Sequence, residues 1–184
     1  MENISPLQHI TQGAATISGQ GVTISDRSMV GKLQVEGVSA ETVLAAAFGA
    51  APSQNADVEV VDGVMIGRIT PSRYLLITEQ DGAAAAAAKV EAAVEDAFIT
   101  VSPQTNGQAM IHVSGEQSQA LLSKLCGLDF NSAEFPVNCV KISSLAKIRV
   151  NIWHTADGYQ LYCGRSYAEY LWQTVRQAGA EFGL

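Results

Sequence analysis

The sequence is poor in basic residues and has no long apolar run. It contains 11 Lys and Arg against 18 Asp and Glu, a formal net charge of −7. Nucleic acids and anionic membrane surfaces both attract clustered Lys and Arg, so we expect neither as a partner. No stretch approaches the ~18 apolar residues that a membrane-spanning helix needs. Residues 1–6 carry an acid and no base, so we expect no secretory signal peptide and a cytoplasmic protein.

Cysteines and metal-binding motifs are also scarce. The three cysteines, Cys126, Cys139 and Cys163, are widely spaced and form no C-x-x-C pair. We therefore predict reduced, mostly buried thiols and no disulfide framework. The three histidines complete no H-E-x-x-H motif, and the one G-x-G, at residues 19–21, opens no strand-to-helix turn. We expect no catalytic, cofactor or metal site in this chain.

What the sequence does contain is a faint internal repeat. Residues 33–37 resemble residues 111–115, because both segments alternate apolar side chains and end in glycine. Each alternation predicts a half-buried strand, and the apolar spacing that follows predicts an amphipathic helix. Gly49 and Gly127 stand at matching positions, where a left-handed residue would end the helix.

The second part of each half also follows one plan. Residues 66–78 and 148–162 each predict a β-hairpin, and the later one contains an Asp-Gly turn signal. Closing helices are predicted over about residues 82–97 and 167–178. A capping box starting at Ser166 is predicted to begin the second of these helices.

This order of elements indicates an α+β fold. We expect two pseudo-repeated lobes of mostly antiparallel sheet with helices on one face. Residues 1–21 are expected to form an irregular N-terminal arm that a partner orders. Residues 22–102 and 103–184 are the expected first and second lobes, in one compact unit overall. The stretch 100–107, rich in Ser, Pro, Thr, Asn and Gly, is the predicted joint.

Few residues are candidates for small-molecule chemistry. His112 lies in a predicted strand and should face the surface, since no nucleophile or carboxylate partner is evident for it. Asp26 and Arg27 are interpreted as a solvated turn before the strand that follows. An anchor for a polar ligand is the alternative interpretation of these two residues.

Basic–aromatic pairs are the candidates for contact with a partner protein. Arginine and aromatic side chains are enriched in the energetic centres of interfaces. The evenly weighted alternative is ordinary surface arginine beside core aromatics. The partner-contact candidates are Arg73, Tyr74, Arg165, Tyr167 and Trp172.

Residues 164–183 contain an Arg-Ser-Tyr-Ala segment, a predicted helix with a tryptophan and a Glu-Phe-Gly finish. This stretch resembles the end of the gamma subunit of heterotetrameric sarcosine oxidase, with Tyr167 in place of that family's phenylalanine. Residues 113–136 place a glycine, a leucine-rich helix, a cysteine, Leu-Asp and Phe-Pro in the family's order. Residues 71–77 resemble its strand of proline followed by aromatic-Leu-Leu.

That family is in turn similar to the folate-binding domain of the glycine-cleavage aminomethyltransferases. Residues 24–33 resemble the aspartate-x-serine entry strand of this superfamily. The aminomethyltransferases carry an Asn-Asp pair after the first helix, and its aspartate is catalytic. Residues 47–53 contain no acid here, which argues against methylene transfer by this chain.

The resemblance implies an accessory subunit without chemistry of its own. The complex would oxidise sarcosine to glycine, hydrogen peroxide and either formaldehyde or methylene-tetrahydrofolate. FAD, FMN, NAD, zinc and tetrahydrofolate would belong to the partner subunits, named alpha, beta and delta in this family.

Two alternatives stay open at this point. One is a stand-alone folate-binding module of the aminomethyltransferase-like superfamily, with a pteridine pocket near Asp26 or Arg73. The other is the small subunit of a related complex that acts on another N-methyl amino acid, such as N-methylglutamate. Self-association of the isolated chain, covering its partner surface, also stays open.

Overall fold

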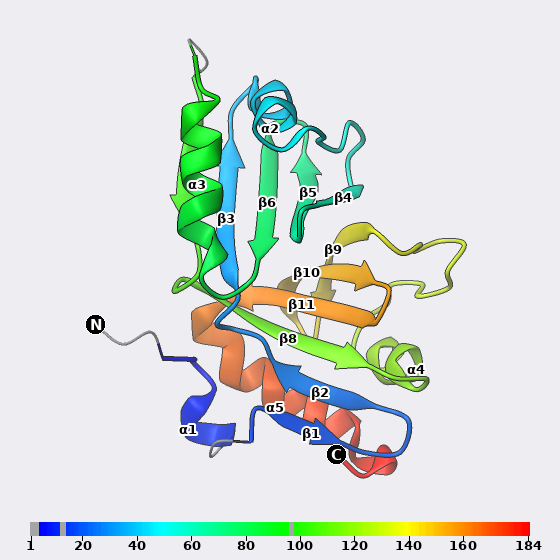
Figure 1. Cartoon of the computed structure of the whole chain (residues 1–184). Helices are drawn as coiled ribbons and strands as arrows, with labels where there is room; N and C mark the ends of the chain where they lie inside the picture. Colours follow the sequence, from blue (N-terminus) through cyan, green and yellow to red (C-terminus); the bar gives the residue numbers. More distant parts are fainter. Residues whose placement is uncertain (1–3, 12–13, 96–97) are drawn as a thin grey trace. The chain divides into compact units, whose positions relative to one another are not determined.

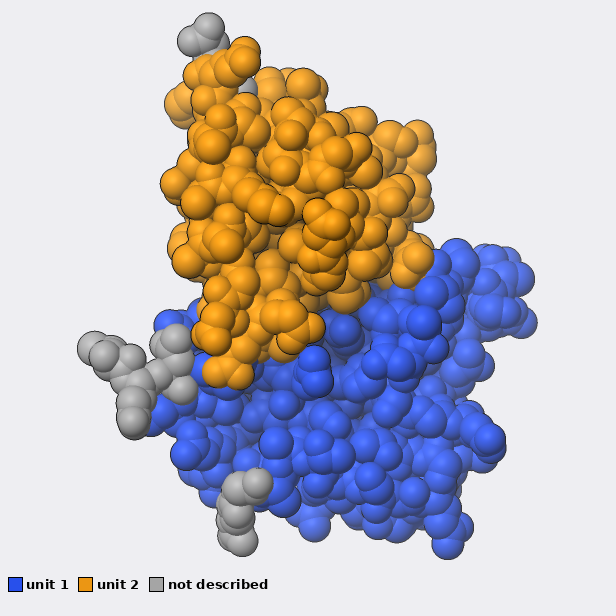
Figure 2. Space-filling model, viewed as in Figure 1, with its two compact units in different colours: residues 1–29, 106–137, 141–184 blue, residues 30–105, 138–140 orange. Residues whose placement is uncertain are grey.

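The structure, a computed structural model, describes residues 4–11, 14–95 and 98–184 (Figure 1). Its strands form two antiparallel sheets accompanied by helices, so the α+β prediction is confirmed. The chain divides into two compact units, coloured separately in Figure 2. Unit 1 comprises residues 1–29, 106–137 and 141–184, and unit 2 comprises residues 30–105 and 138–140. No helix in the described ranges is long and apolar enough to cross a bilayer.

Unit 2 is built on a five-stranded sheet in the order β4-β5-β6-β3-β7. β5 and β6 form the hairpin that was predicted over residues 66–78. β3 carries the predicted alternation and pairs with β6 on one side and β7 on the other. The strands are β3 (Gly31–Glu36), β4 (Val58–Val61), β5 (Val64–Thr70), β6 (Arg73–Thr78) and β7 (Thr100–Pro103).

The core of unit 2 joins this sheet to two helices, α2 (Ala40–Phe48) and α3 (Gly82–Ala92). Leu33 and Leu76 from the sheet and Leu44 from α2 are at most 1% exposed. Gly49 ends α2 with a φ of 85°, as predicted, because glycine takes the left-handed conformation without a steric cost. Residues 96–97, at the predicted end of the other helix, lie outside the described residues.

Unit 1 carries the six-stranded sheet, in the order β1-β2-β8-β11-β10-β9. The predicted hairpin over residues 148–162 is formed by β10 and β11. The strands are β1 (Thr16–Ser18), β2 (Thr23–Asp26), β8 (Gln108–Ser114), β9 (Cys139–Leu145), β10 (Ile148–Thr155) and β11 (Gly158–Gly164). The helices are α1 (Gln8–Thr11), α4 (Ser118–Ser123) and α5 (Ala168–Ala178), with 3-10 turns at Arg165–Tyr167 and Ala180–Phe182.

The division of the chain differs from the lobes expected at residues 22–102 and 103–184. β2 pairs with β8, so residues 23–26 join the sheet of the second repeat. β7 pairs with β3, so residues 100–103 belong to the sheet of the first repeat, the lobe in which residues 100–102 were expected. The strand that precedes each repeat therefore belongs to the sheet of the other repeat. No local sequence pattern encodes such long-range pairings.

Two local predictions are wrong. α4 ends at Ser123, and the bridge of Cys126 to Leu145 follows it, so Gly127 does not stop a helix. Ser166 lies inside a 3-10 turn and no side chain caps α5, so the capping box does not form. Glu169 accepts a hydrogen bond from Gln173 instead, at 3.0 Å.

The described residues of the N-terminal segment, 4–11 and 14–21, form regular elements within unit 1, which differs from the irregular arm that was expected. Its described residues include α1 and β1, and β1 pairs with β2. Leu7 is 0% exposed, and the Ser5 hydroxyl donates a hydrogen bond to the Asp26 carboxylate. The segment therefore contributes Leu7 to the core of unit 1.

Leu7→Ala should test that conclusion. Removing a fully buried leucine side chain should lower the free energy of unfolding by about 2–5 kcal/mol, through lost burial and the cavity left behind. Ile4→Ala, at a side chain that is 49% exposed, is the matched control and should change little. Urea denaturation measures both. Equal, small effects would mean that the segment is not held in the core.

Candidate functional site

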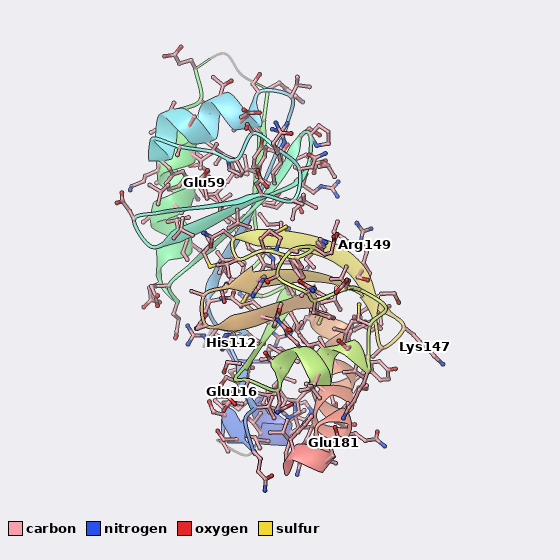
Figure 3. The ribbon with its side chains drawn as sticks, turned by 90° about the vertical axis from the view of Figure 1, so that its right-hand side faces the viewer. Glu59, His112, Glu116, Lys147, Arg149 and Glu181 are labelled. Carbon is pink, nitrogen blue, oxygen red and sulfur yellow. The ribbon has the colours of Figure 1, made fainter. Side chains whose placement is uncertain are left out.

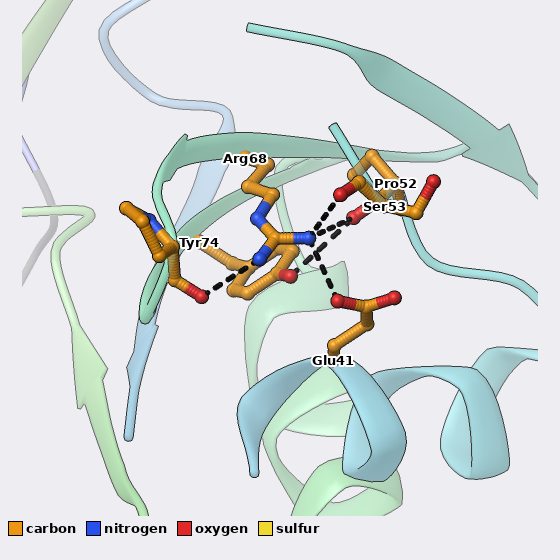
Figure 4. Close-up of polar contacts among 6 residues, drawn as sticks. Glu41, Pro52, Ser53, Arg68 and Tyr74 are labelled. Carbon is orange, nitrogen blue, oxygen red and sulfur yellow. Dashed lines mark hydrogen bonds and ion pairs between the residues drawn. The ribbon is translucent and has the colours of Figure 1, made fainter. Parts of the chain in front are cut away.

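The most densely bonded side chain in unit 2 is Arg68 of β5 (Figure 4). Its Nη1 lies 2.7 Å from Glu41 Oε2 on α2 and also donates to the Ser53 carbonyl. Its Nη2 donates to the Pro71 carbonyl at 3.0 Å. The guanidinium carbon stands 5.5 Å from the centre of the Tyr74 ring. One cation thus ties a strand, a helix and two loops together.

This arrangement is structural and has no free reactive group. The Arg68 side chain is 12% exposed, and its two terminal nitrogens donate to the Glu41 carboxylate and to backbone carbonyl oxygens of the loops. Sequence reasoning missed Arg68. The available signal was a charged residue in an otherwise apolar strand, since such a residue is buried only when it is paired.

The candidates Arg73 and Tyr74 separate in the structure. Arg73 pairs with Glu36 through Nη2–Oε1 at 3.0 Å, and both side chains are about 40% exposed. The Arg73 hydrogen bond lowers the pKa of the Glu36 carboxyl, with smaller opposing effects from burial. Tyr74 is 0% exposed and donates to the Pro52 carbonyl at 3.3 Å. A partner can reach Arg73, whereas Tyr74 fills the core.

The C-terminal candidates separate in the same way. Arg165 donates to the Ile4 carbonyl at 3.1 Å and to the Asn106 carbonyl at 3.4 Å. Tyr167 is 51% exposed, whereas Trp172 is 2% exposed. Arg165 and Tyr167 are therefore accessible to a partner, and Trp172 packs inside unit 1.

His112 is less exposed than predicted. Its side chain is 14% exposed, and Nε2 stands 3.6 Å from Asp157 Oδ2 in the β10–β11 turn, beyond hydrogen-bonding distance. Burial lowers the pKa of His112; Asp157 opposes this effect and Arg27 adds to it. The histidine is thus held neutral beside an acid that does not orient it, an arrangement that favours packing over base catalysis.

His112 should make the chain sensitive to acid. Because its pKa in the fold lies below the unfolded value of about 6.5, the unfolded chain binds the proton first. Stability should therefore be full above that value and fall as the pH drops below it. His112→Gln, which copies Gln34 of the first repeat, should show a smaller loss between about pH 7.5 and 5.5 in urea unfolding. An unchanged loss would assign the sensitivity to other groups.

Asp26 holds the backbone and is not free for a ligand. Its Oδ1 accepts a hydrogen bond from the Ser28 amide at 2.9 Å, and its Oδ2 accepts one from Ser5. The Arg27 amide donates to the Met110 carbonyl at 2.9 Å. The aspartate-x-serine motif therefore closes a turn that ties the N-terminal segment to β8.

The cysteines match their prediction. All three are buried and none forms a disulfide. Burial raises the pKa of Cys163 to about 12, so this thiol stays protonated at neutral pH. Cys126 Sγ contacts the Ser143 hydroxyl at 3.2 Å. Across the described residues, no three His, Cys, Asp or Glu side chains gather as a metal site would require.

Two hollows among the described residues do not resemble a folate site. A hollow of 490 Å³ beside α4 is polar and has no cation in its lining to pair with a carboxylate. A hollow of 220 Å³ in unit 2 is smaller than the ~300–1,000 Å³ typical of small-molecule sites.

Comparison with known proteins places the chain in a family. Residues 7–184 match the profile of the GCVT N-terminal domain. The chain belongs to the GCVT N-terminal domain family. One relative, the sarcosine oxidase subunit gamma of Corynebacterium sp. (strain P-1), is 26% identical to this chain. The match covers 97% of this chain and 90% of the relative. The sarcosine oxidase subunit gamma of Arthrobacter sp. is 27% identical, and the match covers 83% of this chain and 77% of that subunit.

Solved structures support the same placement. A chain of the heterotetrameric sarcosine oxidase from Corynebacterium sp. U-96, in complex with pyrrole 2-carboxylate, superposes with a TM-score of 0.87 at 25% identity. The superposition covers 99% of this chain and 97% of that one. The resemblance read from the sequence is therefore confirmed.

The matches to aminomethyltransferases cover only part of those enzymes. The aminomethyltransferase of Saccharopolyspora erythraea is 25% identical over 71% of this chain and only 36% of its own length. The glycine cleavage aminomethyltransferase T of Bartonella henselae superposes with a TM-score of 0.74 at 15% identity, which shows a shared fold. The chain spans little more than a third of the curated aminomethyltransferase, so that enzyme's activity does not transfer to it.

Proposed function

We propose that this protein is the accessory gamma subunit of a heterotetrameric sarcosine oxidase. The observation that carries the proposal is the match to the gamma subunits over nearly the full length of both chains, 97% and 90%, together with the TM-score of 0.87. A stand-alone folate-binding module is less well supported, because the aminomethyltransferase match covers only 36% of that enzyme.

In this proposal the chain supplies packing surface and the chemistry belongs to its partners. The complex oxidises the N-methyl group of sarcosine, releasing glycine, hydrogen peroxide and formaldehyde, or methylene-tetrahydrofolate when folate accepts the carbon. FAD, FMN, NAD, zinc and tetrahydrofolate are assigned to the alpha, beta and delta subunits. Arg73, Arg165 and Tyr167 are the proposed contacts of this chain with them.

Native copurification tests the proposal. Larger subunits that absorb at about 450 nm, as flavins do, should purify with the chain, and the complex should oxidise sarcosine. Comparison with N-methylglutamate as substrate separates a sarcosine oxidase from a related complex. A chain that purifies alone and colourless, and takes up no added flavoprotein subunits, would contradict the proposal.

The isolated chain also offers a surface for self-association. Val38 and Phe98 are 94% and 93% exposed. The backbone next to Val38 passes close to that of Phe98, because a Cβ atom on Gly37 would stand 2.6 Å from the Phe98 carbonyl oxygen. Large apolar side chains exposed this fully are common where a subunit meets a partner.

A further inference from the structure

The hairpin of β9 and β10 has a charge opposite to that of the chain as a whole. Residues 135–156 contain Lys141, Lys147 and Arg149 and no Asp or Glu, although the chain has 18 acids and a net charge of −7. Such an asymmetry creates a local positive potential on an otherwise negative surface.

Lys147 and Arg149 are both free to bind. Each side chain belongs to an exposed residue, and Figure 3 shows both projecting away from the ribbon. Within the part of the chain that the structure describes, neither takes part in an ion pair or side-chain hydrogen bond. Arg149 lies in β10, two residues after Lys147, which belongs to the turn that precedes this strand.

The turn that carries Lys147 is strained and firmly held. Ala146 and Lys147 form its two central residues, with φ angles of 50° and 70°, a conformation that two-residue hairpins usually give to Asn and Gly. The Tyr170 hydroxyl donates to the Ala146 carbonyl at 2.9 Å, and the Ala146 amide donates to the Leu125 carbonyl at 2.9 Å. Strain maintained by surrounding contacts is typical of functional positions.

Exposed apolar groups accompany the cations. Tyr170 is 46% exposed, and its hydroxyl contacts the turn directly. Ile142 of β9 is 39% exposed. Tyrosine and arginine together with an aliphatic side chain form the composition typical of a protein interface.

We propose that this basic tip, defined as Ile142, Lys147, Arg149 and Tyr170, docks an acidic segment of a partner subunit. The inference rests on the proposed function, because it assumes an assembly with other chains. The occupant follows from charge complementarity. The acidic remainder of the chain repels an acidic partner segment, whereas the basic tip attracts it, so the tip determines where that segment binds. A membrane is disfavoured, because the same net charge of −7 repels anionic lipid.

A double substitution tests the basic tip. Lys147→Asn with Arg149→Gln removes both charges, and asparagine tolerates the left-handed turn, so the melting temperature of the isolated chain should not fall. Association with the separated flavin-bearing subunits should slow by roughly tenfold at low ionic strength, and the difference should shrink with added salt. A charge with a purely structural role would change the melting temperature and not this rate.

The matched control is Lys89→Gln with Arg176→Gln, which removes two exposed charges elsewhere. It should associate at the wild-type rate. If the complex still forms, equal slowing of association by both variants, or no slowing by the first variant, would overturn the proposal that the basic tip docks a partner. Loss of binding to phosphatidylserine vesicles alone would also overturn it. A wild-type chain that forms no complex overturns the proposed function and the basic tip with it.

Discussion

Arg68→Ala should be among the most destabilising single substitutions in unit 2, lowering the free energy of unfolding by about 2–4 kcal/mol. The variant would leave the carbonyls of Ser53 and Pro71 without their donor and Glu41 without its partner. Loss of several charge-assisted hydrogen bonds at a side chain only 12% exposed explains the size of the effect. Urea denaturation at neutral pH would measure it.

Two further variants make this prediction specific. Arg68→Lys should recover only part of the stability, because an ammonium group cannot span acceptors on both sides as the planar guanidinium does. Arg73→Ala breaks an Arg–Glu pair of similar length, 3.0 Å, between half-exposed side chains and should change little. If the Arg68 and Arg73 variants were equally stable, the contacts of Arg68 would contribute no more to the free energy of unfolding than a surface ion pair does.

Gly115→Ala should also be strongly destabilising, by about 3 kcal/mol or more. Gly115 has a φ of 99°, and a Cβ atom there would lie 2.4 Å from the Gly21 carbonyl oxygen. That oxygen already accepts a hydrogen bond from the Gln117 amide at 2.8 Å, so it cannot move away without losing a partner. The substitution therefore adds a backbone clash to an unfavourable φ.

Gly49→Ala separates these two effects. Gly49 has a similar φ of 85°, but a Cβ atom there would meet nothing within 4 Å. It should cost only about 1 kcal/mol, a melting shift of about 2–4 °C for a chain of this size. Calorimetry on both variants would decide the point. Equal shifts would show that conformation alone, and not the contact with Gly21, determines the cost.

Local patterns were sufficient to predict most elements of the fold. Period-two alternation located β3 and β8, and turn chemistry located the β10–β11 hairpin, because both signals depend on neighbouring residues. Gly49 was predicted as a helix stop and is one, whereas its counterpart Gly127 is not. The repeat preserved the strand and the start of the helix but not the helix length.

The pairings between strands that are distant in the chain could not be predicted from the sequence. The partner of β2 lies more than eighty positions away (Asp26 faces Ile111), and no propensity within β2 indicates it. Arg68 was missed for a related reason, since its acceptors come from three separate segments. Arg73 is partly exposed at the start of β6, whereas Tyr74 and the rest of the strand are buried. The amino-acid sequence offers no alternation by which to separate these two neighbours.

The pairing of β2 with β8 has a consequence for the order in which the chain folds. Residues 30–105 contain all the strands and helices of unit 2, so they can pair as soon as they leave the ribosome. β1 and β2 are synthesised first, yet they must wait for β8. Their short length and alternating Thr and Ser limit aggregation during that wait. Pulsed hydrogen exchange during refolding should protect β3 and β6 before β2, and simultaneous protection would exclude this order.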